Sequence, residues 1–245
     1  MIIPAIAIVR KELREALRTT KIYLALIFIF STYLQWFIVR NYASMAKNPS
    51  DSHLPASLTP EQILLLAPTF SLIFVAPIVI PFFSNTILSR SLIRERFAGS
   101  LITLLSTGVN PGLVWGAKVM AAFLFSYPVA LACLSLDLLM IKFYFKLPIA
   151  WSPSLIVTVL IIAPFASLAI VAIMSFLFWT VRPAHFIASF LPVMVSLGLF
   201  AYASAHPVTE VLVRGVVLAL VASAVLLGAC GFAISKLSRR FIAGL

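Results

Sequence analysis

Acidic side chains are the first place to look for chemistry, because the chain has only seven of them in 245 residues. Most stand in polar segments, namely Glu12, Glu15, Asp51, Glu61, Glu95 and Glu210. Asp137 is the exception, since it stands inside a long apolar run, where a carboxylate is costly and marks a function or a buried partner. We expect it to pair with Lys142, Arg40 or Arg214; the alternative is contact with a substrate or a proton. Gln35, in another apolar run, joins Asp137 in a predicted intramembrane polar site.

The sequence contains no grouping typical of a catalytic or metal site. His185 and Ser189 lie one helical turn apart, but the pattern offers neither a carboxylate to orient the histidine nor a G-x-S-x-G turn. Glu210 and Arg214, also one turn apart, are expected to pair with each other. The scattered histidines and cysteines lack the spacing of metal ligands. The string 112–119 lacks the spacing and the magnesium-binding hydroxyl of a phosphate-binding loop, so we predict a non-catalytic chain that binds no cofactor itself.

Composition decides what surrounds the chain. Hydrophobic residues make up 62% of it and charged residues only 10%, whereas an average soluble domain carries roughly 25% charged residues. A soluble fold would lack the polar groups needed to cover its surface. The net charge of +11 comes from short clusters of cations between long apolar runs, which is typical of membrane proteins and not of a nucleic-acid-binding face. We therefore predict an integral membrane protein with no nucleic-acid partner.

Six apolar runs are long enough to cross a bilayer, which takes about 20 residues of helix. They cover approximately residues 22–39, 63–88, 119–141, 154–179, 184–204 and 211–235. They are too long, and too apolar on every face, to be strands of a membrane barrel. The predicted fold is therefore an all-α integral membrane protein with six transmembrane helices. Thr59, Pro60 and Glu61 indicate where the helix of the second run begins.

The distribution of Lys and Arg predicts the orientation. Thirteen cations flank the runs on one side, namely Arg10, Lys11, Arg14, Arg18, Lys21, Arg90, Arg94, Arg96, Lys118, Arg182, Lys236, Arg239 and Arg240. Five lie on the other side, namely Arg40, Lys47, Lys142, Lys146 and Arg214. By the positive-inside rule both termini are cytoplasmic, and the protein is expected in the cytoplasmic (inner) membrane as a multi-pass protein.

The residues before the first run form a second unit. Within residues 2–18, apolar side chains recur at helical spacing, and Arg10, Lys11, Arg14 and Arg18 occupy the remaining surface. Such a helix lies flat on the membrane, with its cations toward anionic lipid headgroups. We therefore divide the chain into an N-terminal amphipathic interfacial helix, 1–21, and a six-helix transmembrane domain, 22–245, with a cytoplasmic loop at 89–118.

This loop carries a recognisable pattern. Residues 94–110 read RERFAGSLITLLSTGVN, and Gly116-Ala117-Lys118 follows. The string resembles the loop of the ABC type-2 permease family, which reads E-x-x-x-G-[TS]-L-x-x-L-L-x-[TS]-P-[VI] and then G-K. Gly108 replaces the usual proline, and Ala117 is inserted into the G-K pair. The stretch Arg10-Lys11-Glu12-Leu13 is similar to the entry helix of that family.

The resemblance implies a transport mechanism. In that family two permease subunits, identical or different, pair in the membrane, and each docks a separate cytoplasmic ATPase that carries the ATP and magnesium. The loop would hold a coupling helix seated on the ATPase, and the entry helix would brace it. The residues expected to contact the ATPase are Arg94, Glu95, Arg96, Gly99, Ser100, Leu104 and Thr107.

The implied function is the permease subunit of an ATP-binding-cassette exporter. The few polar residues within the runs favour a hydrophobic or amphipathic substrate. The main alternative is a non-transporting membrane scaffold, or an envelope or cytochrome assembly factor. In that case the basic loop would only fix the orientation of the chain in the membrane. A secondary transporter would need midplane ions and an inverted repeat, and the sequence shows neither.

Overall fold

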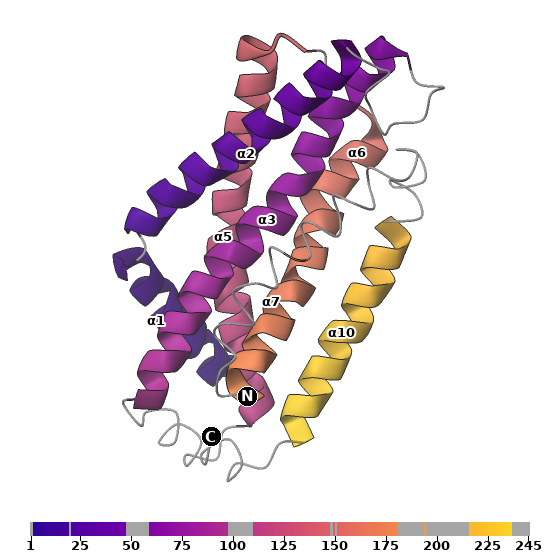
Figure 1. The fold of residues 1–245 in the computed structure, drawn as a ribbon. Helices are drawn as coiled ribbons and strands as arrows, with labels where there is room; N and C mark the ends of the chain where they lie inside the picture. Colours follow the sequence, from indigo (N-terminus) through magenta and orange to yellow (C-terminus); the bar gives the residue numbers. More distant parts are fainter. Residues whose placement is uncertain are drawn as a thin grey trace.

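A computed structural model of the chain describes residues 2–19, 21–47, 59–97, 110–147, 149, 151–180, 194 and 216–236. Every element in these ranges is helical, so the all-helical prediction is confirmed for them. Long helices lie side by side, and a shorter one lies across one end of the group (Figure 1). The α-helices are α1 Ile2–Thr19, α2 Lys21–Lys47, α3 Pro60–Phe97, α5 Pro111–Leu139, α6 Pro153–Val157, α7 Ala163–Thr180 and α10 Val216–Lys236.

Local sequence explains where two of these helices begin. The Asn110 side chain accepts a hydrogen bond from the Gly112 amide at 2.8 Å, and Pro111 occupies the first turn of α5. Ser152 caps α6 in the same way by accepting from the Leu155 amide at 3.1 Å. A cap followed by proline starts a helix well, because the missing proline N–H would have had no helical partner. α3 begins at Pro60, as the sequence predicted.

Two segments of π-helix interrupt the regular geometry. Met140–Tyr144 continues α5, and Thr158–Ile162 joins α6 to α7. A π turn frees a backbone carbonyl that an α-helix would pair internally. The Tyr127 hydroxyl of α5 donates to the carbonyl of Leu160 within the second segment at 3.0 Å.

Three helical stretches are long and apolar enough to cross a membrane: Ser71–Leu92, Pro111–Tyr144 and Pro153–Trp179. They correspond to the second, third and fourth predicted runs. A shorter apolar stretch, Val221–Ile234, lies within the sixth. The first predicted run falls within α2, and of the fifth only Met194 is described.

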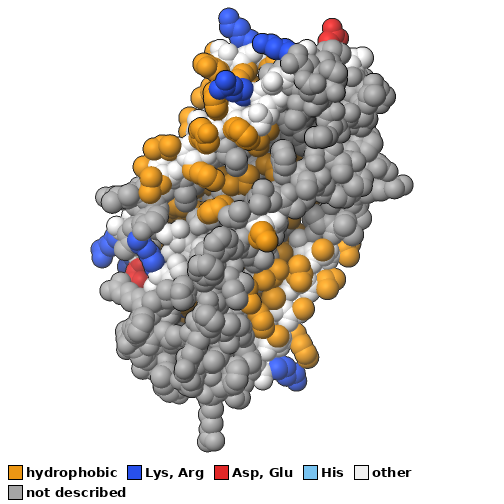
Figure 2. Space-filling model, viewed as in Figure 1, with side chains coloured by type: hydrophobic (Ala, Val, Ile, Leu, Met, Phe, Trp, Pro, Cys, Tyr) orange, Lys and Arg blue, Asp and Glu red, His pale blue; other side chains and the backbone are white. Residues whose placement is uncertain are grey.

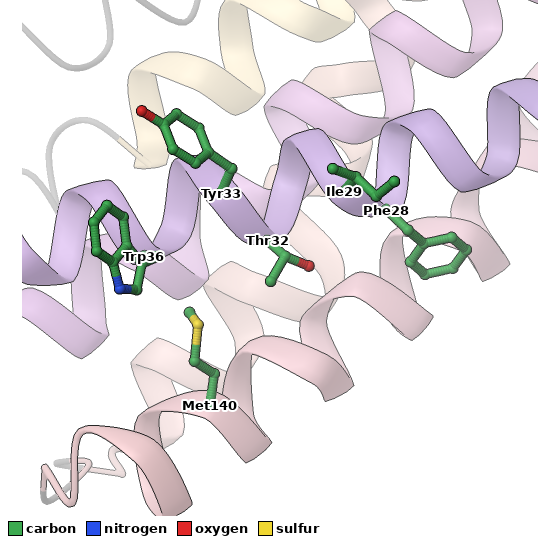
Figure 3. Close-up of a pocket in the computed structure, with 6 residues that line it drawn as sticks. All are labelled: Phe28, Ile29, Thr32, Tyr33, Trp36 and Met140. Atoms are coloured by element: carbon green, nitrogen blue, oxygen red, sulfur yellow. The ribbon is translucent and has the colours of Figure 1, made fainter.

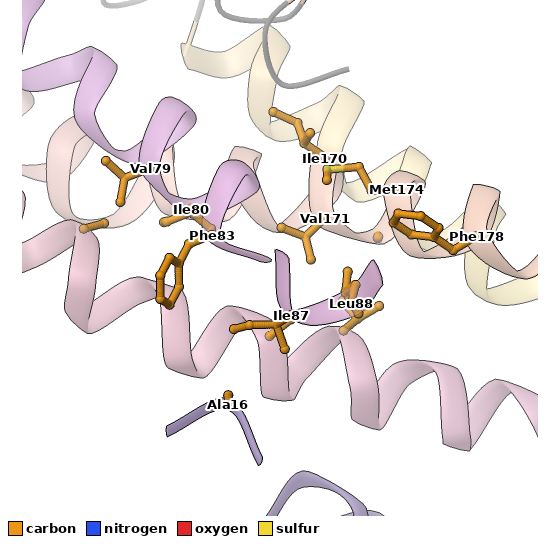
Figure 4. Packing of buried hydrophobic residues seen from close by; sticks show 14 of the residues in the cluster. Ala16, Val79, Ile80, Phe83, Ile87, Leu88, Ile170, Val171, Met174 and Phe178 are labelled. Atoms are coloured by element: carbon orange, nitrogen blue, oxygen red, sulfur yellow. The ribbon is translucent and has the colours of Figure 1, made fainter. Parts of the chain in front are cut away.

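α3 is the central helix, because it packs against α2, α5 and α7. Its residues Ile80 and Phe83 are fully buried, as are Val171 and Met174 of α7. Figure 4 shows these side chains meeting between the helices. The Ser84 and Ser126 hydroxyls lie 2.8 Å apart and join α3 to α5 with a buried polar contact. α10 packs mainly on α7.

The outer surface is apolar along the helices. Figure 2 shows hydrophobic side chains over the described length of the molecule, with Lys and Arg gathered near the ends of the helices. Large side chains such as Ile29 and Phe232 are each 67% exposed. A water-facing surface rarely carries so much exposed apolar area, and a lipid-facing surface requires it. The arrangement is that of a membrane protein.

Candidate functional site

α1 presents three different faces. Ala16 and Glu12 are buried against the rest of the molecule, and Ile8 packs on its core. Ile6 and Leu17 form an exposed apolar face, each 60% exposed. The helical period of 3.6 residues separates these faces from the basic one. α1 is therefore amphipathic on its outer faces, and its inner face is docked on α5.

The basic face of α1 is exposed, as the sequence predicted for its cations. It surrounds a shallow surface hollow of about 540 Å³. Its charged lining residues are Arg10, Lys11, Arg14, Glu15 and Arg18. Cations in this position on an amphipathic helix attract anionic lipid headgroups.

A buried ion pair joins α1 to the bundle. The Lys118 ammonium of α5 lies 2.6 Å from Oε1 of Glu12, and the two side chains are only 1% and 4% exposed. The same ammonium donates to the Ser91 hydroxyl of α3 at 2.8 Å. These three residues, the Glu12–Lys118–Ser91 triad, tie three helices together at one point. The removal of one partner would leave a buried charge without compensation, which costs about 3–5 kcal/mol in proteins.

The burial of the triad was not predicted from the sequence. Glu12 stands in a polar segment and Lys118 among the cations expected on the cytoplasmic side, yet both side chains are buried. The cause is the start of α5 at Pro111, which places Lys118 two turns inside a helix whose face packs on α1.

The predicted loop 89–118 is also shorter than expected, because α3 runs to Phe97 and α5 begins at Pro111. Both helix ends carry polar residues, and for this reason the sequence predicts them as part of the loop. Arg94, Glu95 and Arg96 therefore belong to the last turn of α3. The other expected ATPase contacts, Gly99, Ser100, Leu104 and Thr107, lie outside the described residues.

Asp137 is 1% exposed, and neither of its carboxylate oxygens has a hydrogen-bond partner among the described residues. The expected pairs with Lys142 and Arg40 are not formed. The Lys142 ammonium lies 5.7 Å from the centre of the Phe143 ring, and the Arg40 guanidinium lies 4.8 Å from that of Trp36. The Lys142 side chain is exposed whereas Asp137 is buried, so Lys142 projects from another face.

The third expected partner of Asp137, Arg214, lies outside the described residues, as do His185, Ser189 and Glu210. Gln35, the second predicted polar residue, is 1% exposed and accepts a hydrogen bond from the Ser71 hydroxyl of α3. It is therefore buried with a partner, in contrast to Asp137.

Metal-binding side chains do not gather in the described ranges, where no group of three or more His, Cys, Asp or Glu occurs. Cys133 and Cys230 are buried free thiols. The described part of the chain thus offers a structural ion pair and a buried carboxyl group, and neither forms a nucleophile–base–orienter arrangement.

Comparison with known proteins gave no match to any protein-family model, curated protein or solved structure. Function must therefore be inferred from the site itself.

The sequence reasoning missed Ser91 and the pairing of Glu12 with Lys118. The available signal was the position of Glu12, which lies between the apolar and basic faces of α1 in an otherwise apolar sector.

Proposed function

We propose that this chain is the permease subunit of an ATP-binding-cassette exporter in the cytoplasmic membrane. It crosses the membrane six times with both termini in the cytoplasm, and it pairs with a second permease subunit. A separate cytoplasmic ATPase binds ATP and magnesium and drives a hydrophobic or amphipathic substrate outward.

The Glu12–Lys118–Ser91 triad is the observation that carries this proposal. Ser91 lies six residues before the end of α3, and Lys118 lies in the third turn of α5. Between these helix ends lies the segment 98–110, whose sequence resembles the family's coupling helix. A partner that pushes on this segment would move two spans together, because the buried ammonium holds both of them to α1.

The segment from Arg94 to Thr107 contacts the ATPase in this proposal. Arg94, Glu95 and Arg96 supply charges on the last turn of α3, and Gly99, Ser100, Leu104 and Thr107 follow. Charges at an interface steer association and set its register, while an apolar residue such as Leu104 would supply contact area.

The test is co-purification of the chain with an ATPase and measurement of ATP hydrolysis in lipid nanodiscs. We expect the chain to stimulate hydrolysis, and Glu95→Ala or Gly99→Leu to remove the stimulation. Lys47→Ala is the matched control, since this exposed cation ends α2 on the opposite side of the predicted membrane.

Stimulation that survives replacement of the whole segment 99–107 by a Gly-Ser linker would overturn the proposal. Capture of a partner without any stimulated hydrolysis would favour the membrane scaffold instead.

A further inference from the structure

Asp137 plays no part in the proposed coupling to an ATPase, yet it is among the most enclosed polar groups of the chain. Its carboxylate oxygens have no hydrogen-bond partner among the described residues, and the residue is 1% exposed. A carboxyl group in an apolar interior must carry a proton or accept a cation, because an isolated charge there is very costly. Its acceptor atoms are therefore available to a ligand.

Buried polar side chains line the contacts that α2 makes with α5 and α3. Cys133, one turn before Asp137 on α5, lies beside Ser31 of α2. Gln35 follows Ser31 by one turn and accepts its hydrogen bond from Ser71 of α3. α2 and α5 run in the same direction (Figure 1), so one turn along each helix leads from the Ser31–Cys133 contact to the level of Gln35 and Asp137. We call these five buried residues the polar cluster.

The outer side of the same α2–α5 seam carries an apolar groove of about 470 Å³. Its lining residues are Phe28, Ile29, Thr32, Tyr33, Trp36 and Met140. Figure 3 shows Phe28 and Thr32 pointing from α2 toward α5, and Met140 pointing back toward Thr32. Thr32 adjoins Ser31 in sequence, and Met140 follows Asp137 by three residues, so the groove and the polar cluster occupy the two sides of one seam.

We propose that this seam binds a lipophilic amine, a molecule with an aromatic or alkyl body and one ammonium group. The body lies in the groove against Phe28, Tyr33 and Trp36, and the ammonium pairs with Asp137. Met140 is the residue that must move to admit it, and its unbranched, flexible side chain suits that role. The inference rests on the proposed transport function, whose substrate class it specifies, but binding itself requires no ATPase.

Charge complementarity selects this ligand over others. An anion would be repelled by Asp137, and an uncharged lipid tail would fill the groove while leaving the carboxyl group without a partner. The aromatic lining favours a cation too, because ring faces attract positive charge. The Trp36 ring already does so, with the Arg40 guanidinium 4.8 Å from its centre.

The helix geometry at the groove supports the same assignment. α5 changes from α-helix to π-helix at Met140, the residue that lines the groove and follows Asp137 by less than one turn. Single π segments within helices recur at functional sites, where the wider turn repositions side chains.

The experiment uses the whole chain in lipid nanodiscs without any ATPase. The probe is a dansyl-labelled dodecyl chain that ends in a primary amine, and its N-acetylated counterpart is the uncharged control. We expect the amine to bind at least about tenfold more tightly than the amide, as a desolvated charge pair requires. Asp137→Asn should abolish the difference, and Asp137→Glu should retain part of it. Ser135→Ala, an exposed position on the same helix, should leave it unchanged.

Equal binding of the amine and the amide to the parent chain would overturn the inference, and so would undiminished amine selectivity in Asp137→Asn. If Asp137→Asn does not fold, the comparison of amine binding with amide binding to the parent chain still decides. In addition, Trp36→Leu must weaken the binding of both probes if the groove holds the apolar body. Amine selectivity without a coupled ATPase would overturn the proposed transport function and leave the site standing. ATPase coupling without amine selectivity would overturn the site alone.

Discussion

Oε1 of Glu12 and Nζ of Lys118 meet at 2.6 Å across 106 residues of sequence, and water is excluded from both side chains. This contact fixes the N-terminal helix to the bundle. Burying two charges is expensive, and the geometry compensates by pairing them and by giving the ammonium a second acceptor in Ser91. The pair therefore acts as a specific link between helices and contributes little net stability.

Neutralising one partner of this pair should destabilise the protein strongly. We expect Glu12→Gln to lower the free energy of unfolding by about 3–5 kcal/mol, because it leaves the Lys118 ammonium buried without its counter-ion. The double variant Glu12→Leu with Lys118→Met should lie within about 1 kcal/mol of the parent, since an apolar pair needs no compensation. Chemical unfolding in detergent micelles measures both values.

The control for this experiment is Arg10→Gln, which removes an exposed charge from the same helix. Its effect should stay below about 0.5 kcal/mol, as is usual for exposed positions. A Glu12→Gln variant as stable as this control would show that the ion pair is not formed.

The Asn110 side chain, which caps α5, should stabilise the first turn of this helix. Asn110→Ala removes the acceptor of the Gly112 amide and should cost about 0.5–2 kcal/mol. Hydrogen exchange of the amides at 112–115 should accelerate accordingly. Asn110→Asp retains the acceptor and should exchange like the parent; faster exchange in this variant would contradict the capping role.

Two glycines of α10 should respond differently to the same substitution. A Cβ at Gly231 would lie 3.7 Å from Cζ3 of Trp115, whereas nothing lies within 4 Å of one at Gly228. Gly231→Ala should therefore be tolerated, but Gly231→Leu should cost about 1–3 kcal/mol through overpacking. Gly228→Leu is the matched control and should be nearly neutral in thermal unfolding. An equal loss at both positions would indicate that α10 does not pack on Trp115.

The predicted orientation can be tested with single cysteines. Arg18→Cys and Lys47→Cys place thiols at exposed positions on opposite sides of the predicted membrane. In intact cells a membrane-impermeant maleimide should label Lys47→Cys alone, and in inverted vesicles Arg18→Cys alone. Cys133 and Cys230 are buried and should remain unlabelled in the parent chain. Labelling of Arg18→Cys from outside would reverse the topology and remove the basis for a cytoplasmic partner.

Much of the architecture was predictable because it depends on short-range signals. Long apolar runs can only become helices in lipid, and three of them coincide with helices long enough to cross it. The start of α3 at Pro60 followed from local sequence. The Asn110-Pro111 pair is an equally clear start signal, and attention to it would have placed Lys118 inside a helix.

The contacts between helices were not predictable in the same way. The pairing of Glu12 with Lys118 depends on how two helices cross, which no periodicity reveals. Lys142 does not pair with Asp137, because nearness in sequence does not ensure nearness in space. The helical turn sends the two side chains to different faces, and only the fold shows that Asp137 is enclosed without either expected partner.

The 106-residue separation between Glu12 and Lys118 also constrains biosynthesis. At about 5–20 residues per second the ribosome needs roughly 5–20 seconds to make the intervening chain. During that interval Lys118 has not yet been made, so Glu12 cannot form this ion pair. The ion pair that fixes α1 to the bundle can therefore close only after α5 has begun to form, which makes the docking of α1 a late step in folding.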